Sequence, residues 1–286
     1  MLLTKSEVER LLIENNFNSR AALIENIQLS YRLTTVTDSN KLGVTKFGGY
    51  PDLPLGLDWP YYNGSPMSFI CQINLSDLPF SRCKIDIPSS GMLYFYFDST
   101  QHAYGCDPEN KAANKVIYID GNINKFQERI VHFSEEKIIF KQCIIDPVPE
   151  MTILPWESVL LRQNPLSKEE RIQYGKLIDN IADLQVPTQN DILHRFLGNP
   201  DPMQDDPFEC CQLASGGINC SYQVCYHSNN VRSMLNNVDR WTLLLQVDSD
   251  PDIDFLWADK GRLYFCIDKN DLFNANFDNV WTIMQW

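Results

Sequence analysis

The sequence lacks the features that place a protein in a membrane or send it outside the cell. No apolar run approaches the ~18 residues that a membrane helix needs, so we expect no membrane association. The first residues show no charged leader followed by an apolar core, so we expect no signal peptide. The 9 cysteines are odd in number, and several lie in apolar runs, where a free thiol behaves as a small hydrophobic group. We therefore predict a protein of the reducing cytoplasm.

A basic cluster is also missing. The formal net charge is −13, and Lys and Arg are scattered along the chain. Proteins that bind nucleic acids normally present a basic face to the phosphates, so we expect no nucleic-acid partner. An acidic surface instead suits a basic protein partner.

Catalytic motifs are absent as well. The sequence contains no Gly-x-Ser-x-Gly elbow, no His-Glu-x-x-His and no Gly-x-x-x-x-Gly-Lys phosphate loop. Two of the 4 histidines lie near cysteines, His102 by Cys106 and His227 by Cys225, a proximity that is more often incidental than catalytic. We predict no catalytic residue and no cofactor.

Two clusters of metal-ligand residue types do not fit metal sites. Cys210, Cys211, Cys220 and Cys225 lack the paired Cys-x2-4-Cys spacing of structural zinc sites, and their role stays open. The acidic run 248–254 has no glycine or bidentate glutamate where a calcium loop needs them. Aspartates in such a run typically cap backbone N–H groups, so we predict no metal site.

The sequence does contain a repeated stretch. Gly91-Met-Leu-Tyr-Phe-Tyr-Phe-Asp98 recurs as Gly261-Arg-Leu-Tyr-Phe-Cys-Ile-Asp268, with five of eight positions identical. Ahead of it, Gly49-x-Pro-Asp52 recurs as Gly198-x-Pro-Asp201. The shared order of these segments indicates an internal duplication, in which each half has a sheet and a glycine-proline loop.

The same order holds for two glutamines inside apolar strands. Gln72 lies in Phe69-Ile-Cys-Gln-Ile-Asn74, and Gln246 lies in Leu243-Leu-Leu-Gln-Val-Asp248. An amide in such a strand must find partners or cost about 1–3 kcal/mol. Each glutamine either ties its strand to the neighbouring loop or faces a cleft and binds a peptide backbone; we favour the structural role.

The predicted fold is α+β, mainly antiparallel, with two pseudo-repeated sheet-containing halves. Capping boxes indicate a helix over residues 4–16 and another from Ser167 to about residue 184. We expect one domain with four segments: an N-terminal helix and strand (1–40), a first repeat (41–160), a connecting helix (161–190) and a second repeat (191–286).

The chain resembles the YwqG-like family of uncharacterised bacterial proteins. The residues that carry the resemblance are, in order, Lys46-Phe-Gly-Gly-Tyr-Pro-Asp-Leu-Pro54 with Trp59-Pro60, Gln72-Ile-Asn-Leu75, Gly91-x-Leu-Tyr-Phe95, His194-Arg-Phe-Leu-Gly-Asn-Pro-Asp201 with Cys211-Gln-Leu213, Leu243-Leu-Leu-Gln-Val-Asp-Ser-Asp250 and Trp257-Ala-Asp259. The resemblance implies a duplicated α+β fold and no established activity. It extends distantly to eukaryotic ribosome-biogenesis chaperones of the programmed-cell-death-two type. Ala258 departs from the expected glycine and is strained if its φ is positive.

These observations favour a non-enzymatic protein that binds a protein or peptide, as a chaperone or an immunity-type protein does. The residues predicted to bind it lie in or near the loops at the strand ends: Trp59, Gln72, Gln246, Asp250, Trp257 and Asp259. The alternative is a hydrolase-like enzyme with an unrecognised thiol or carboxylate site, drawn from Asp205, Asp206, Asp250 or Asp259.

Overall fold

The fold is built on one large antiparallel sheet. The computed structural model describes residues 2–36, 41–79, 87–121, 126–130, 139–186, 192–221, 224 and 226–286. The strands of the large sheet are β1 (Gln28–Val36), β2 (Lys46–Phe47), β6 (Ser68–Asn74), β7 (Met92–Phe97), β8 (Asn114–Ile119), β10 (Cys143–Thr152), β11 (Arg195–Phe196), β12 (Trp241–Asp248), β13 (Arg262–Asp268) and β14 (Trp281–Gln285). Two small ribbons pair β3 (Asp52–Pro54) with β9 (Phe126–Glu128) and β4 (Tyr61–Tyr62) with β5 (Ser65–Pro66).

The strand order of the large sheet is symmetric in its pattern about the two central strands. It runs β14-β13-β12-β11-β1-β10-β2-β6-β7-β8, with β1 and β10 paired at the centre. Each half therefore has a two-residue strand next to the central pair, followed by three consecutive antiparallel strands. The prediction of an α+β fold with mainly antiparallel strands is confirmed.

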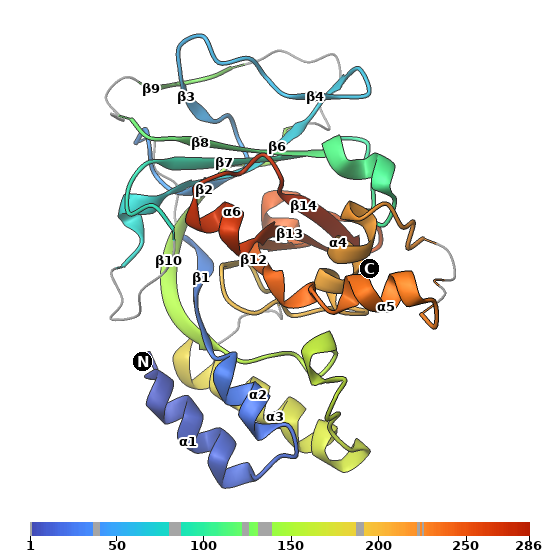
Figure 1. The fold of residues 1–286 in the computed structure, drawn as a ribbon. Coiled ribbons are helices and arrows are strands. Elements are labelled where there is room, and N and C mark those ends of the chain that lie inside the picture. The colour runs from blue at the N-terminus through green and yellow to red at the C-terminus, as the bar shows by residue number, and fades with distance from the viewer. Residues whose placement is uncertain are drawn as a thin grey trace.

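The sheet curls into a near-barrel, so that its two halves face each other (Figure 1). The inner faces of β7 and β13 meet in one apolar core, where the rings of Phe95 and Phe265 lie 5.4 Å apart. The outer face of the second half is covered by α4 (Pro207–Ser215), which packs Phe208 and Cys211 against that face. The outer face of the first half is covered by the loop that contains Trp59.

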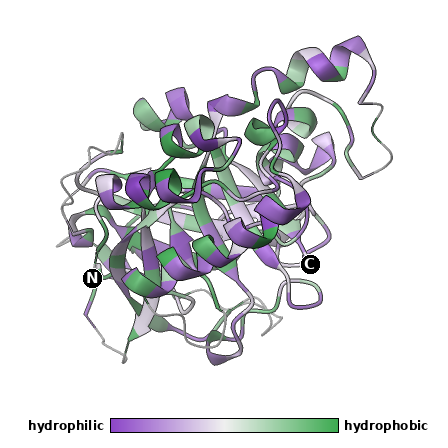
Figure 2. Ribbon diagram, turned by 90° about the horizontal axis from the view of Figure 1, so that it is seen from below, coloured by the Kyte–Doolittle hydropathy of each residue, from purple (hydrophilic) through white to green (hydrophobic). Residues whose placement is uncertain are grey.

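A layer of helices lies at one end of the sheet, at the bottom of Figure 1. It consists of α1 (Lys5–Asn15), α2 (Arg20–Glu25) and α3 (Lys168–Gln185), which bury a separate apolar cluster against the end of β10. In Figure 2 the helices carry both hydrophilic and hydrophobic residues, and the residues that α1 and α3 bury are mainly apolar, such as Val8, Leu12 and Leu177, as amphipathic helices require. The shorter helices α5 (Asn229–Leu235) and α6 (Lys269–Phe273) belong to the second half.

Capping decides where the two long helices begin. Ser167 caps α3 together with Glu170, as predicted. At α1 the N-cap is Thr4, whose side chain accepts from the N–H of Glu7.

β10 is a strand that contains two prolines. Ile145 donates its N–H to Thr45, and Met151 donates its N–H to the side chain of Gln185 in α3. Alternate N–H groups of a strand point to the same side, and the two intervening positions on that side are Pro147 and Pro149, which have no N–H. This edge of β10 is therefore closed to further strand pairing.

Candidate functional site

Gln72 and Gln246 fix the two glycine-proline loops. Both side chains are fully buried. The amide oxygen of Gln72 accepts the N–H of Asp52 at 2.8 Å, and that of Gln246 accepts the N–H of Asp201 at 2.8 Å. Each amide nitrogen donates to the carbonyl of a residue ahead of its loop, Val44 or Leu193. These contacts tie each strand to its neighbouring loop, as expected for a structural role of the two glutamines.

The two tryptophans predicted to bind a ligand are buried on opposite sides of the sheet. Trp59 packs edge-on against Tyr96 on the outer face and donates its indole N–H to Met67. Trp257 lies in the inner core and donates its indole N–H to Asp248. The next residue, Ala258, has φ 47°, in the left-handed region where an alanine is strained.

The two predicted aspartates are in different surroundings. Asp250 is buried, where it contacts the His194 ring at 3.2 Å and caps the turn that follows by accepting the N–H of Asp252. Asp259 is exposed. The six predicted residues thus lie in several places, and their role in binding stays a prediction.

A cleft with a volume of about 490 Å³ lies between α3 and the sheet. It is lined by Arg32, Glu150, Met151, Thr152, Ile153, Pro155, Ile178, Asp179, Ile181, Ala182, Asp183, Leu193, Arg195, Pro200 and Asp201. Its volume falls within the range of about 300–1,000 Å³ typical of small-ligand sites.

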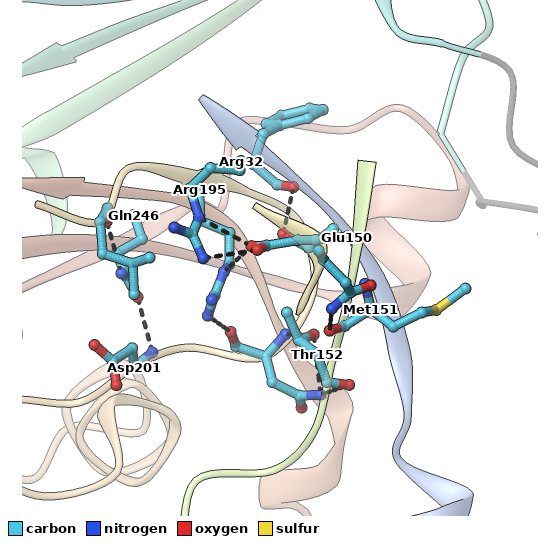
Figure 3. Close-up of polar contacts among 12 residues, drawn as sticks. Arg32, Glu150, Met151, Thr152, Arg195, Asp201 and Gln246 are labelled. Atoms are coloured by element: carbon cyan, nitrogen blue, oxygen red, sulfur yellow. Dashed lines mark hydrogen bonds and ion pairs between the residues drawn. The ribbon is translucent and has the colours of Figure 1, made fainter. Parts of the chain in front are cut away.

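Two arginines and a glutamate form the polar centre of this cleft (Figure 3). Arg32 and Arg195 are paired neighbours on β1 and β11, and both side chains turn to Glu150 of β10. Nη2 of Arg32 donates to Glu150 at 2.7 Å, and Nε of Arg195 donates to it at 2.9 Å. One carboxylate thus serves two guanidinium groups.

Each arginine keeps one donor group free of protein partners. Arg32 uses Nε and Nη2 on Glu150, and Arg195 uses Nε on Glu150 and Nη1 on the carbonyl of Asn199. Among the residues that the structure describes, neither Nη1 of Arg32 nor Nη2 of Arg195 has a partner. The side chains are only 3% and 9% exposed. Neither donor atom is among the fully buried atoms that lack a partner, so both are accessible from the cleft that the two side chains line. Guanidinium donors bind anions through charge-assisted hydrogen bonds, so the cleft is suited to an anion.

The polar centre of the cleft carries a net positive charge. Burial and the neighbouring Arg195 lower the pKa of Arg32, and Glu150 offsets part of that shift. Because a guanidinium stays protonated at any physiological pH, two positive charges face one negative charge here.

The rim of the cleft carries the opposite charge. Asp179 and Asp183 are exposed on α3, and Asp201 is 47% exposed on the second glycine-proline loop. Asp201 pairs with Arg262, which also binds Asp248 at 2.7 Å. Burial lowers the pKa of Arg262, but the neighbouring acidic groups outweigh that effect and raise it. The cleft thus combines a cationic floor with an acidic rim.

Two carboxyl groups near the cleft have raised pKa values. Burial, with Asp201 and Asp206 nearby, raises the pKa of Glu157 to about 7. Burial raises the pKa of Asp206 to about 6, although its carboxylate accepts the N–H groups of Val159 and Phe208. Neither residue lines the cleft.

One feature of the sequence points to this site. Arg195 precedes Phe196 as Lys46 precedes Phe47, so the repeated loop segment begins with a cation in both halves. Glu150 gave no signal, because the prolines on either side of Val148 concealed the strand that carries it.

The fold and the site together define a class of protein: a curled antiparallel sheet with a helical layer, and an arginine-lined cleft between them. Residues 45–285 match the family described as a domain of unknown function, DUF1963, and the chain belongs to this family. No curated protein matches the chain.

Two searches of the described residues complete the description. None of their helices combines the length and the apolar character needed to cross a bilayer. No three His, Cys, Asp or Glu side chains among them are grouped so as to hold a metal ion. Cys225, one of the four cysteines singled out in the sequence, lies outside the described residues.

Proposed function

We propose that this protein is a non-enzymatic binding protein that holds a protein or peptide by one of its carboxylates in the cleft between α3 and the sheet. The observation that carries the proposal is a pair of donors, Nη1 of Arg32 and Nη2 of Arg195, that have no partner among the described residues and belong to buried side chains lining this cleft. Guanidinium groups bind carboxylates through parallel, charge-assisted hydrogen bonds.

The acidic rim indicates what flanks that carboxylate. Asp179, Asp183 and Asp201 surround the entrance, and the whole chain has a net charge of −13. A segment with net negative charge is repelled on approach, whereas a segment that is basic overall is attracted. The ligand that fits best is therefore a basic segment with a carboxylate, at its C-terminus or on an Asp or Glu side chain.

Pairing of a ligand strand with the edge of β10 that borders the cleft is disfavoured. The prolines of β10 remove two outward N–H groups, and Gln185 occupies both backbone groups of Met151, at 2.7 Å and 2.9 Å. The ligand is held through its carboxylate and neighbouring side chains, and not by pairing with the sheet.

The chemistry of the lining supports binding over catalysis. Among the described residues that line the cleft, Thr152 alone carries a hydroxyl. Its oxygen donates to Gln28 and accepts the N–H of Asn199, so it is already engaged on two sides.

The proposal is tested with pools of hexapeptides of randomised sequence, labelled with an uncharged BODIPY dye that carries no carboxylate and measured by fluorescence polarisation. One pool has free C-termini, a second is amidated, and a third is amidated and also lacks Asp and Glu. Binding of the first pool alone assigns the C-terminal carboxylate, and binding of the first two assigns side-chain carboxylates. Equal binding of the third pool, or binding of none, overturns the proposal.

A variant pair connects the binding to the cleft. Arg195→Lys keeps the charge beside Glu150 but loses the planar fork, so affinity falls about 10- to 100-fold. Arg171→Lys is the matched control, because Arg171 lies on α3 but outside the lining and stacks on Trp156. Its affinity stays that of the wild type.

The second candidate, a hydrolase-like enzyme, has one specific observation in its favour. Glu157 and Asp206 have pKa values of about 7 and about 6, as a general acid and base require. Asp206, however, is the N-cap of α4, which gives its carboxylate a structural task. A hydrolytic activity found with generic ester, phosphoester or peptide substrates and lost in Glu157→Gln establishes this candidate; unchanged activity in that variant removes it.

The finer family assignment belongs to the same proposal. Membership of the YwqG-like group, the distant similarity to ribosome-biogenesis chaperones, a bacterial source and a cytoplasmic location are consistent with the binding role. We propose likewise that the protein has no nucleic-acid partner, because a net charge of −13 disfavours phosphate backbones, and no membrane partner.

A further inference from the structure

A cluster of thiols joins the two halves of the sheet at a point away from the cleft. Cys210 on α4 donates its thiol hydrogen to Cys106, with 3.1 Å between the two sulfur atoms. Cys106 lies in the segment that follows β7 of the first half, whereas α4 covers the second half. Two thiols distant in sequence are thus in direct contact.

The pair differs from the other thiol pair in accessibility. Cys106 and Cys210 are half-buried, whereas Cys211 and Cys266, which interact on the inner side of α4, are fully buried. A small oxidant in solution reaches the first pair and not the second. Oxidation of cysteine follows exposure and thiolate character.

We propose that Cys106 and Cys210 form a redox-modification site, at which a hydroperoxide converts the two thiols to a disulfide. The thiolate of Cys106 attacks the terminal oxygen of the hydroperoxide, the O–O bond breaks, and the leaving alkoxide or hydroxide takes up a proton. Cys210 then attacks the sulfur of the resulting sulfenic acid and releases water. With hydrogen peroxide, two thiols and one peroxide give one disulfide and two waters.

The hydrogen bond assigns the two roles. Cys210 is the donor, and this bond lowers the pKa of Cys106, so Cys106 forms the thiolate more readily. The same bond, with a further contact to Cys220, raises the pKa of Cys210. Cys106 is therefore the attacking thiol and Cys210 the resolving thiol.

The segment around Cys106 is already held against the second half. Tyr104 accepts the N–H of Met284 at 3.0 Å, and Gly105 accepts the indole N–H of Trp281 at 2.7 Å. These contacts keep the two sulfurs near each other without the disulfide. Once formed, the disulfide links the first half covalently to α4 and restrains the curled sheet from opening.

A third thiol, that of Cys220, lies close to this pair. The N–H of Cys220 donates to the carbonyl of Cys106 at 2.7 Å, and its thiol donates to Ile218. The Cys220 thiol also contacts Cys210. The proposal assigns the bond to Cys106 and Cys210, whose sulfur atoms lie 3.1 Å apart, and the test distinguishes the pairings.

The full chain is treated with a few equivalents of hydrogen peroxide, remaining thiols are alkylated, and a non-reducing peptide map is read by mass spectrometry. The expected product is a peptide that links Cys106 to Cys210, with two thiols lost. Cys106→Ser and Cys210→Ser abolish it, and Cys143→Ser, which removes a half-buried thiol elsewhere, leaves it unchanged. A main product that joins Cys210 to Cys220 or Cys225, or alkylation of both Cys106 and Cys210 after oxidation, overturns the proposal.

Thermal unfolding gives an independent readout. The oxidised wild type melts about 5 °C higher than the reduced protein, because the link constrains the unfolded chain, and dithiothreitol reverses the shift. Cys106→Ser, Cys210→Ser and the double variant show no shift on oxidation. A shift that persists in these variants contradicts the assignment.

Discussion

The two glycine-proline loops share one framework of contacts and differ in what they leave open. In both halves a buried glutamine accepts the N–H of the loop aspartate, at 2.8 Å for Gln72 and 2.8 Å for Gln246. In both halves a tyrosine of the next strand, Tyr94 or Tyr264, donates to the carbonyl of that aspartate. Such correspondence is what an internal duplication leaves, and duplication stays a prediction.

The difference lies in the cation at the start of each loop segment. Lys46 contacts the carboxylate of its own loop, Asp52, at 3.1 Å, and both side chains are buried. Arg195 turns away from Asp201 to Glu150 of β10, which leaves Asp201 at the rim. The first loop is therefore closed on itself, whereas the second opens into the cleft.

The neighbours on the central strands account for this difference. Lys46 pairs with Ile144 of β10, an apolar residue that offers its charge no partner. Arg195 pairs with Arg32 of β1, and two adjacent guanidinium groups need a shared carboxylate. One backbone scaffold thus supports a structural ion pair at one end and a binding site at the other.

The largest expected effect separates the two loop aspartates. Asp52→Asn leaves the buried Lys46 charge without its carboxylate, so we expect a loss of about 3–5 kcal/mol in the free energy of unfolding. Asp201→Asn affects a half-exposed group, and we expect a loss below about 1 kcal/mol. Guanidinium chloride titrations measure both, and equal losses contradict the comparison.

A smaller effect tests the shared framework. Gln72→Leu removes three hydrogen bonds, to Asp52 N–H, the Asp52 carboxylate and Val44, whereas Gln246→Leu removes two, to Asp201 and Leu193. Each change leaves buried polar groups unpaired and costs about 2–4 kcal/mol for Gln72 and about 1–3 kcal/mol for Gln246. A neutral Gln246→Leu variant, measured by urea unfolding, shows that the second loop is held in another way.

The smallest effect concerns pH at the open end. The pKa of Glu157 is about 7 in the fold against an ordinary 4.5, so the folded state binds this proton more tightly. Its contribution to stability is present below pH 4.5 and is lost as the pH rises to about 7. Glu157→Gln therefore flattens the stability profile between those values, by less than about 1 kcal/mol because the group is partly exposed. Calorimetric melting at pH 5 and pH 8 measures it; an identical profile in the variant contradicts the raised pKa.

The fold was largely predictable where a local pattern determined it. The capping box at Ser167 and Glu170 predicted the start of α3, and the helix predicted over residues 4–16 corresponds to α1. β10 was not recognised, because prolines argue against a strand and only the pairing with β1 and the contact with Gln185 show why they are tolerated.

The site was less predictable, because it depends on contacts between distant segments. Arg32, Glu150 and Arg195 meet through the pairing of three strands, and no spacing in the sequence records it. The glutamines were conspicuous in the sequence because a polar residue in an apolar strand needs partners, yet those partners are backbone groups of the loops. Residues that stand out in a sequence can thus stabilise a site without lining it.

The most direct test follows the arginine side chains themselves during binding. A free-acid peptide chosen from the polarisation screen is titrated into protein labelled with ¹⁵N in arginine, and the guanidinium NMR signals are assigned with Arg32→Lys, Arg195→Lys and Arg171→Lys. The account predicts that the signals of Arg32 and Arg195 shift with the same dissociation constant as the polarisation, whereas Arg171 does not move. Binding that leaves the Arg32 and Arg195 signals unchanged contradicts the account.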